Sequence, residues 1–468
     1  MGDIGEIMNR SARAFDLYKR ISLKERSALM HAIADELEAG KNDIIAAAMA
    51  ETNLSEKRLQ TELTRTAFQM RSYGDHAATA EWMDIRIDKG DKDRVPPKPD
   101  LRKMMIPLGP VIVFGAANFP FAYSTAGGDT ACALAAGCSV VVKAHPGHLQ
   151  TGILVAEAVQ AAVKKCALPE DVFIHVTDSS IQAGEALVKH PLTKAVGFTG
   201  SFKGGKQLFD WGNRRETPIS VFAEMSSVNP VFIFPAKLNA AIKETAAMLA
   251  GSITLDAGQF CTNPGIVIGI DNADLGAFID ELKLNLEKTN AVRMLNEGIE
   301  KNYLSAKEKA LAQNDVSVLF DKPAELHTET VTIATTDAGT FIENDILQQE
   351  VFGPYSIIVK CKDLQEMNKV ALFLKGQLTA TIIATEEEVL SNPSLIENIR
   401  SLCGRCIMNG VPTGVEVCLA MQHGGPFPAS TDSRFTSVGA DGIKRFARPQ
   451  SFQNWPEALL PDELKEGS

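Results

Sequence analysis

One cysteine of the chain stands in a segment that can present it to a substrate. Cys261 lies among turn-forming and small polar residues in the segment 258–265, and the apolar run Ile266–Ile268 follows. This pattern predicts a thiol on a loop that a strand holds in place. A thiolate attacks electrophilic carbon, and we expect a loop that lines a polar cleft to lower the pKa of Cys261. Most free cysteines pack as small hydrophobes, so Cys261 alone does not establish catalysis.

Two further side chains would complete such chemistry. Asn118 follows the apolar run Val111–Phe114 in a glycine-containing turn, where an amide can donate a hydrogen bond to a developing oxyanion. Glu224 ends the run Ile219–Ala223, and we expect its apolar neighbours to raise its pKa so that it takes a proton from water. Singly, Asn118 also fits a turn residue and Glu224 a surface ion pair. Together with a loop cysteine they favour catalysis.

A glycine-rich segment predicts a phosphate site. Gly200 and Ser201 follow the apolar run 195–198 and open a helical pattern that contains Lys203. Glycines let backbone N–H groups approach a ligand, and a helix N-terminus favours anions. The segment lacks the G-x-G-x-x-G spacing and is therefore weak as a generic motif. Lys143, which ends the run 139–142, could hold a ribose or a phosphate.

The elements that must position these residues alternate between strands and helices. Buried strands are expected at 111–114, 139–143, 172–176 and 195–198, with helices at 125–136, 149–165 and 181–190 between them. Such alternation predicts a parallel sheet covered on both faces. A helix expected at 238–255 leads to the cysteine loop, and the alternation continues to about residue 384, which indicates a second α/β domain.

The flanking segments differ from this pattern. The first 80 residues have helical periodicity with a stop at Gly40, whereas 88–106 is charged and rich in proline, as in an exposed arm or a linker. The polar tail from residue 445 is expected to pair with the arm. We predict three parts: a nucleotide-binding domain (1–87 and 107–235), a catalytic domain (236–430), and an arm with a C-terminal tail (88–106 and 431–468).

The composition excludes several function classes. The chain has 468 residues and a net charge of −11, which gives no basic footprint for nucleic acid or an anionic membrane surface. The 8 cysteines have no regular framework, so we expect reduced thiols and a cytoplasmic protein without a signal peptide. His145 and His148 lack further ligands nearby in the sequence, and no metal site is expected.

In sequence order, these motifs resemble those of the aldehyde dehydrogenase superfamily along nearly the whole chain. The resemblance implies two parallel-sheet α/β domains, one of them Rossmann-like, with a small β oligomerisation arm, and a homodimer or homotetramer. It implies that Cys261 adds to an aldehyde, that Asn118 and the Cys261 N–H hold the oxyanion, that hydride passes to NAD or NADP, and that Glu224 activates water. The motifs are Asn118, Lys143, the F-T-G-S loop at 198–201, Glu224, G-Q-x-C at 258–261 and E-x-F-G-P at 350–354.

The same resemblance suggests further site residues. Lys143 and Glu350 would grip the cofactor riboses, and Phe352 would steady the nicotinamide side. Phe119 and Phe260 would line the substrate tunnel. Arg65 would meet a distal carboxylate, although a surface charge explains it equally well. The expected cofactor site comprises Lys143, His145, Gly200, Ser201, Lys203, Glu350 and Phe352.

Variants within these motifs are similar to the 2-oxoglutarate semialdehyde (2,5-dioxopentanoate) dehydrogenase branch, at 142–146, 223–230, 412–417 and 423–426. Two departures from the wider family matter. Ser226-Ser227 replaces a glycine pair, and Pro146 stands where many NAD-using members have a carboxylate. Without that carboxylate, and with His145, His148, Lys203 and Lys206 near in sequence, we expect NADP to be accepted and weakly preferred.

Other functions remain open at this level. Another aldehyde, such as succinate semialdehyde or an aliphatic or fatty aldehyde, would suit the same motifs. A CoA-acylating dehydrogenase is disfavoured by Glu224, which thioester transfer does not need. A thiol hydrolase would pair Cys261 with a histidine such as His423. A catalytically silent relative is the alternative outside enzymes.

Overall fold

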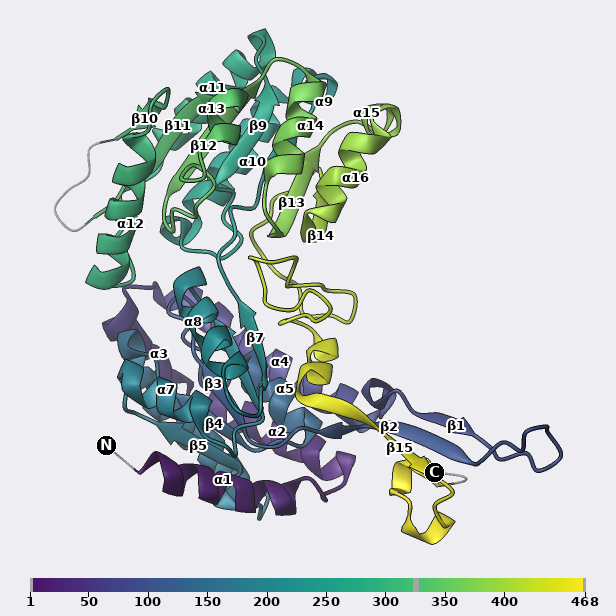
Figure 1. The fold of residues 1–468 in the computed structure, drawn as a ribbon. Helices are drawn as coiled ribbons and strands as arrows, with labels where there is room; N and C mark the ends of the chain where they lie inside the picture. Colours follow the sequence, from purple (N-terminus) through teal and green to yellow (C-terminus); the bar gives the residue numbers. More distant parts are fainter. Residues whose placement is uncertain (1–2, 323–327, 466–468) are drawn as a thin grey trace.

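The computed structural model describes residues 3–322 and 328–465 and has the expected α/β architecture. Two sheets with their helices lie one beyond the other, and a small antiparallel sheet projects sideways as an arm (Figure 1). Within the described ranges, none of the helices combines the length and the apolar character that crossing a bilayer requires.

The first sheet has five parallel strands in the order β5-β4-β3-β6-β7. The chain enters at the centre with β3, moves outward to β5, and returns to the other side of β3 with β6. Ligands of such sheets bind at the carboxyl ends of the strands where this direction changes. The order confirms the predicted Rossmann-like sheet. Its strands are β3 (Val111–Phe114), β4 (Val140–Lys143), β5 (Phe173–Val176), β6 (Ala195–Thr199) and β7 (Ser220–Glu224).

Both faces of this sheet are buried, which explains its continuous apolar runs. Val111 and Val113 pack with helices α5 (Gly128–Ala136) and α6 (Leu149–Lys165), whereas Ile112 packs on the opposite face with α7 (Ile181–Lys189) and α8 (Phe202–Asn213). Burying one such side chain contributes about 1.5–3 kcal/mol. The predicted N-terminal helices extend this core and are α1 (Ile4–Tyr18), α2 (Leu23–Ala39), α3 (Lys41–Thr52) and α4 (Glu56–Ala78).

The second sheet has seven strands in the order β10-β11-β12-β9-β8-β13-β14, with only the β10–β11 pair antiparallel. The single helix expected at 238–255 is two helices, α9 (Pro235–Ala240) and α10 (Ile242–Thr254), because Ala241 has non-helical φ and ψ of −147° and 41°. The other helices are α11 (Ala273–Leu286), α12 (Glu297–Leu311), α13 (Ala338–Glu343), α14 (Leu364–Phe373), α15 (Glu386–Ser391) and α16 (Pro393–Ser401). The strands are β8 (Val231–Ile233), β9 (Ile266–Ile270), β10 (Ser317–Asp321), β11 (Thr332–Asp337), β12 (Tyr355–Cys361), β13 (Gln377–Ile383) and β14 (Cys403–Met408).

The strand pairing shows where the chain leaves the first sheet and enters the second. Strand β8 pairs with β9 and β13 of the second sheet, whereas the predicted nucleotide-binding segment extends to residue 235. The chain therefore passes from the first sheet to the second between β7 and β8. The division into three domains itself stays a prediction.

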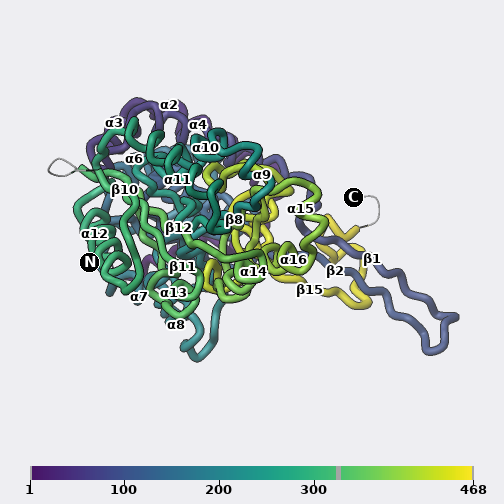
Figure 2. The backbone as a smooth tube through the Cα atoms, turned by 90° about the horizontal axis from the view of Figure 1, so that it is seen from above, coloured from purple at the N-terminus to yellow at the C-terminus, as the bar shows by residue number. Residues whose placement is uncertain are grey.

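Of the two expected possibilities for the segment 88–106, an exposed arm and a linker, the structure has the arm. Strand β1 (Arg86–Asp88) pairs antiparallel with β2 (Leu101–Pro107), and β15 (Ala447–Gln453) pairs with the other edge of β2 from Pro107 to Leu101. Residues more than 330 positions apart thus share one small sheet, which confirms the predicted pairing of tail and arm. Figure 2 shows the arm reaching away from the two α/β layers.

Candidate active site

The loop that carries Cys261 runs from a 3-10 turn at Leu255–Gly258 to β9 and is fixed from two sides. Gly258 has φ +64°, and a Cβ there would come within 2.3 Å of the Gly353 carbonyl oxygen, so only glycine allows this close packing. The Asn229 amide donates hydrogen bonds of 2.9 Å to the carbonyls of Cys261 and Asn263. The half-buried thiol is therefore held by backbone contacts on both sides.

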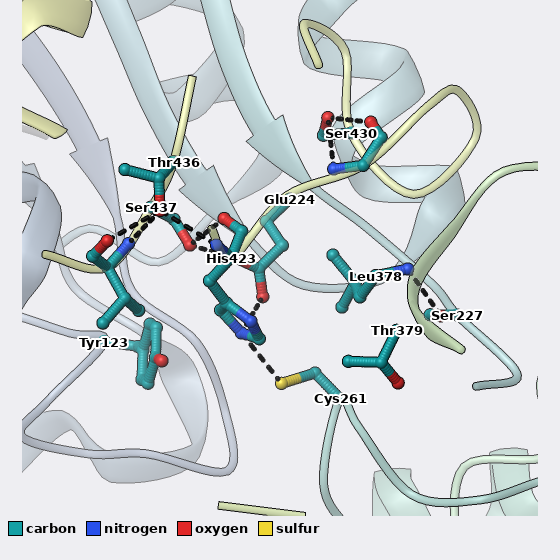
Figure 3. A network of polar contacts seen from close by, with 12 residues as sticks. Tyr123, Glu224, Ser227, Cys261, Leu378, Thr379, His423, Ser430, Thr436 and Ser437 are labelled. Atoms are coloured by element: carbon teal, nitrogen blue, oxygen red, sulfur yellow. Dashed lines mark hydrogen bonds and ion pairs between the residues drawn. The ribbon is translucent and has the colours of Figure 1, made fainter. Parts of the chain in front are cut away.

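Three side chains from distant parts of the chain converge at this loop (Figure 3). Cys261 Sγ lies 3.6 Å from His423 Nε2, and the same nitrogen lies 3.1 Å from Glu224 Oε1. Glu224 ends β7, whereas His423 belongs to the long loop after β14. Both are almost fully buried. The structure thus brings together a thiol, an imidazole and a carboxylate.

Asn118 reaches the same loop. It follows β3, and its Nδ2 donates a 2.9 Å hydrogen bond to the carbonyl of Gln259, two residues before Cys261. The amide therefore lies beside the cysteine loop, as its proposed role requires. Its role as an oxyanion donor stays a prediction.

Aromatic side chains cluster beside these groups. Phe119 and Phe260 meet edge to face with centroids 5.5 Å apart, and Phe119 meets Tyr123 in the same way at 5.1 Å. Tyr123 lies 6.3 Å from the His423 ring, and the guanidinium of Arg65 lies 5.4 Å from the Tyr123 ring. Contacts through Tyr123 therefore link the predicted tunnel residues Phe119, Phe260 and Arg65, and their role in lining a tunnel stays a prediction.

The carboxyl ends of the first sheet carry several of the residues predicted to bind the cofactor. Lys143 ends β4 with 8% of its surface exposed, and Ser201 caps α8 by accepting a hydrogen bond from the Gly204 N–H. His145 lies just beyond Lys143, and Gly200 donates its N–H to the Glu224 carbonyl at 3.1 Å. A buried ammonium and a capped helix N-terminus at one sheet edge are suitable partners for ribose and phosphate.

The remaining predicted cofactor residues, Glu350, Phe352 and Lys203, differ in how far they are buried. Glu350 and Phe352 line a small cavity together with Phe260. Burial raises the pKa of Glu350 to about 7, against hydrogen bonds from Ser226 and Ser227 that lower it. Of the expected cofactor-binding set, Lys203 is exposed at the start of α8.

The sequence and the fold were compared with those of known proteins. The sequence model of the aldehyde dehydrogenase family matches residues 2–448. The chain belongs to the aldehyde dehydrogenase family. It is similar to alpha-ketoglutaric semialdehyde dehydrogenase 2 of Azospirillum brasilense (43% identity, covering 100% of this chain and 89% of the relative) and to alpha-ketoglutaric semialdehyde dehydrogenase of Acinetobacter baylyi (40%, 100% and 89%). Its fold resembles that of Staphylococcus aureus betaine aldehyde dehydrogenase (TM-score 0.82, 17% identity, 97% and 87% covered).

In this aldehyde dehydrogenase the pKa of Glu224 differs from the sequence prediction, which was wrong in sign. Burial does raise the pKa of Glu224, but the contacts with His423 and Ser437 and the charge of Arg445 outweigh it and leave the pKa lowered. Ser437 Oγ donates to Glu224 Oε2. The carboxylate is consequently ionised near neutral pH and can accept a proton.

The prediction for the thiol was also wrong. Burial, followed by the negative charges of Glu224 and Glu350, raises the pKa of Cys261 well above its ordinary value, and Arg65 and Arg405 only partly oppose this. Burial of the thiol and the two carboxylates outweigh any effect of the polar turn residues beside Cys261 in the sequence. The resting aldehyde dehydrogenase therefore holds a neutral thiol, and the His423 imidazole is the ring that lies beside it.

This arrangement predicts opposite effects of two charge changes on Cys261. Replacing Glu350 by glutamine removes a negative charge and should lower the pKa of Cys261, whereas Arg405→Met removes a positive charge and should raise it. Iodoacetamide modification of the Cys261 peptide, followed by mass spectrometry across pH, measures the inflection. Wild type should titrate above the free-thiol value of about 8.5. An inflection that stays in place in both variants would contradict these assignments.

Several site residues of the aldehyde dehydrogenase were missed or misjudged from sequence. His423 appeared in the segment 423–426 of the resemblance and as the partner of a rival hydrolase, but not as a contact of Glu224, and Tyr123, Ser437 and Arg405 were not considered. Tyr123 had a usable signal, because it lies in the same turn as Asn118 and Phe119. Ser437 had none, since it contacts Glu224 from 213 positions away.

Proposed function

We propose that this aldehyde dehydrogenase oxidises 2-oxoglutarate semialdehyde (2,5-dioxopentanoate) to 2-oxoglutarate with NAD or NADP. The main support for this chemistry is the geometry of the site, where Cys261, His423 and Glu224 lie in contact with Asn118 nearby. The names of the two relatives at 40–43% identity support the substrate. Arg65 and Arg405 also place positive charge within electrostatic reach of Cys261, which suits an aldehyde with a distal carboxylate.

The chain's own groups define the steps. His423 Nε2 accepts the Cys261 proton, and the nearby Glu224 carboxylate stabilises the charged ring. The thiolate adds to the aldehyde carbon, while Asn118 and the Cys261 N–H hold the resulting oxyanion. Bound oxidised nicotinamide supplies the acceptor for the hydride that leaves this carbon. Glu224 then takes a proton from water as the water attacks the thioester, and the thiolate leaves to release the acid.

An aldehyde panel tests the substrate. It compares 2-oxoglutarate semialdehyde with succinate semialdehyde, an uncharged aldehyde of equal length and a fatty aldehyde. The carboxylated C5 compound should give the highest kcat/KM, and Arg65→Met should reduce that value about tenfold while sparing the uncharged aldehyde. Equal rates for all four aldehydes would contradict the substrate assignment. Free acid as product, with or without CoA, excludes acyl transfer to CoA.

The Cys261–His423 contact also supports a second candidate, a thiol hydrolase. Such an enzyme would hydrolyse esters without nicotinamide at rates comparable with semialdehyde oxidation. Turnover of p-nitrophenyl acetate in cofactor-free protein, measured beside the dehydrogenase assay, separates the two. A catalytically silent relative would do neither.

For the cofactor, we propose a weak preference for NADP that depends on Lys203. Burial lowers the pKa of His145 to about 3, so this ring is uncharged and attracts a phosphate only by hydrogen bonding. Lys206 is paired with Asp210 at 2.6 Å, whereas Lys203 is exposed. Lys203→Ala should lower kcat/KM for NADP about tenfold with little change for NAD. Lys206→Ala is the matched control, and equal effects of both changes would count against this assignment.

We further propose a cytoplasmic homodimer or homotetramer acting on a small molecule, with no nucleic-acid or membrane partner. The projecting arm presents Val95 with 93% of its surface exposed, which suits a contact with a second copy. All 8 cysteines are free, as in reducing surroundings. Light scattering of the intact chain and of a variant without residues 89–99 tests the assembly. A monomeric intact chain would contradict it.

A further inference from the structure

The side chains of Cys261, His423 and Glu224 are also of the types that bind a metal ion. Cys261, His423 and Glu224 form a set whose donor atoms all lie within 4.8 Å of one another, and no other such trio of His, Cys, Asp and Glu side chains occurs in residues 3–322 and 328–465. Thiolate, imidazole and carboxylate are the three ligand types that zinc takes in proteins. Magnesium and calcium, which prefer oxygen ligands alone, do not suit the set.

The distances match a tetrahedral ion. Bond lengths of about 2.0–2.3 Å place neighbouring donor atoms of a tetrahedral zinc site about 3.3–3.7 Å apart. In the structure, Sγ of Cys261 lies 3.6 Å from Nε2 of His423, and this nitrogen lies 3.1 Å from Oε1 of Glu224. The third separation, between Sγ of Cys261 and a Glu224 oxygen, is below 4.8 Å, so small side-chain movements bring all three donor atoms to one ion.

The carboxylate supplies an independent observation. Glu224 is 4% exposed, and its Oε1, although 3.1 Å from the imidazole, is not aligned for a hydrogen bond and has no such partner in the described chain. Its other oxygen accepts from Ser437 Oγ. Outer hydrogen bonds of this kind orient metal ligands and leave the second oxygen for the ion. A buried anionic oxygen without a hydrogen bond carries a desolvation cost that a cation relieves.

The cysteine is positioned in the same way. Asn229 holds the Cys261 carbonyl at 2.9 Å, and the backbone N–H of His423 donates to Thr436 Oγ1 at 2.9 Å. All three ligands are thus anchored by neighbours that do not themselves contact the donor atoms. Such anchoring reduces the reorganisation that ion binding requires.

We propose that Cys261, His423 and Glu224 bind one Zn²⁺ per chain and that the bound ion reversibly inhibits the dehydrogenase. On binding, the Cys261 S–H bond breaks, its proton passes to solvent, and zinc bonds to sulfur, to His423 Nε2 and to Glu224 Oε1. The sulfur lone pair needed for attack on the aldehyde is then engaged. The proton-accepting nitrogen and the water-activating carboxylate are occupied at the same time.

The test measures metal binding without substrate or cofactor. Cofactor-free full-length protein is titrated with Zn²⁺ against a chromophoric chelator, and Co²⁺ is used as a spectroscopic substitute. We expect one zinc per chain, and a thiolate-to-cobalt charge-transfer band with the intense visible bands of a tetrahedral site. Cys261→Ser and His423→Gln should each weaken zinc binding at least about 100-fold, and Glu224→Gln about tenfold. Cys406→Ser, at an exposed cysteine, is the matched control and should bind as wild type.

Three results would overturn the proposal. Equal zinc affinity of wild type and His423→Gln would indicate capture by thiols alone, and a cobalt spectrum without the charge-transfer band would exclude the sulfur ligand. Inhibition by zinc that EDTA does not reverse would contradict the reversible role. Because binding is measured without turnover, a chain that binds zinc but does not oxidise semialdehydes would refute only the proposed function.

Discussion

Replacing Cys261 by alanine is expected to reduce semialdehyde-dependent formation of NADPH or NADH by about 10⁴-fold or more. Loss of a covalent nucleophile removes the whole two-step route, and losses of this size follow when one member of a catalytic unit is deleted. The measurement is absorbance of the reduced nicotinamide, at enzyme concentrations high enough to detect single turnovers.

The fold should survive this change. Cys261 lies on a loop held by its backbone, through the Asn229 amide and the close packing of Gly258, so the side chain is not needed for the loop conformation. Cys418→Ala, at an exposed cysteine, is the matched control and should retain wild-type turnover. Unchanged cofactor reduction in Cys261→Ala would refute the proposed chemistry, provided that circular dichroism shows both variants folded.

The sequence was sufficient for the framework of the site because that framework depends on local patterns. Strands such as β3 and β4 are apolar on both faces, and this property is visible in the consecutive apolar residues 111–114 and 140–142. Asn118, Lys143 and Glu224 were correctly placed at strand ends, because a parallel sheet sends its carboxyl ends to one edge. The same reasoning missed the break at Ala241, where no glycine or proline marks the interruption.

The ionisation of the site could not be predicted in this way. Both pKa predictions failed, for Cys261 and for Glu224, because the groups that decide them lie far away in the chain. His423 is 162 positions from Cys261, and Ser437 is 213 positions from Glu224. A pKa sums burial and charges in space, and neighbours in sequence contribute only part of that sum.

These contacts predict that replacing Glu224 and replacing His423 will affect different steps. In Glu224→Gln the thiolate still adds and hydride still leaves, so one equivalent of reduced cofactor should form in a burst. Steady-state turnover should then fall by about 10²–10⁴-fold, because water lacks its base. In His423→Gln the burst itself should slow by about 10²-fold, because the neutral thiol has lost its proton acceptor.

The pH dependence separates the two roles further. Because the pKa of Cys261 is raised, the burst rate of His423→Gln should climb with pH as the thiol ionises unaided, and should approach the wild-type rate in alkaline buffer. Hydroxide should not restore the burst-to-steady-state ratio of Glu224→Gln to the same degree, since the missing group acts on a positioned water. Stopped-flow recording of cofactor reduction, with rapid-quench mass measurement of the acylated enzyme, follows both phases. If His423→Gln kept a normal burst at neutral pH, Glu224 acting through water would be the thiol's base, and the 3.6 Å contact between sulfur and imidazole would serve positioning alone.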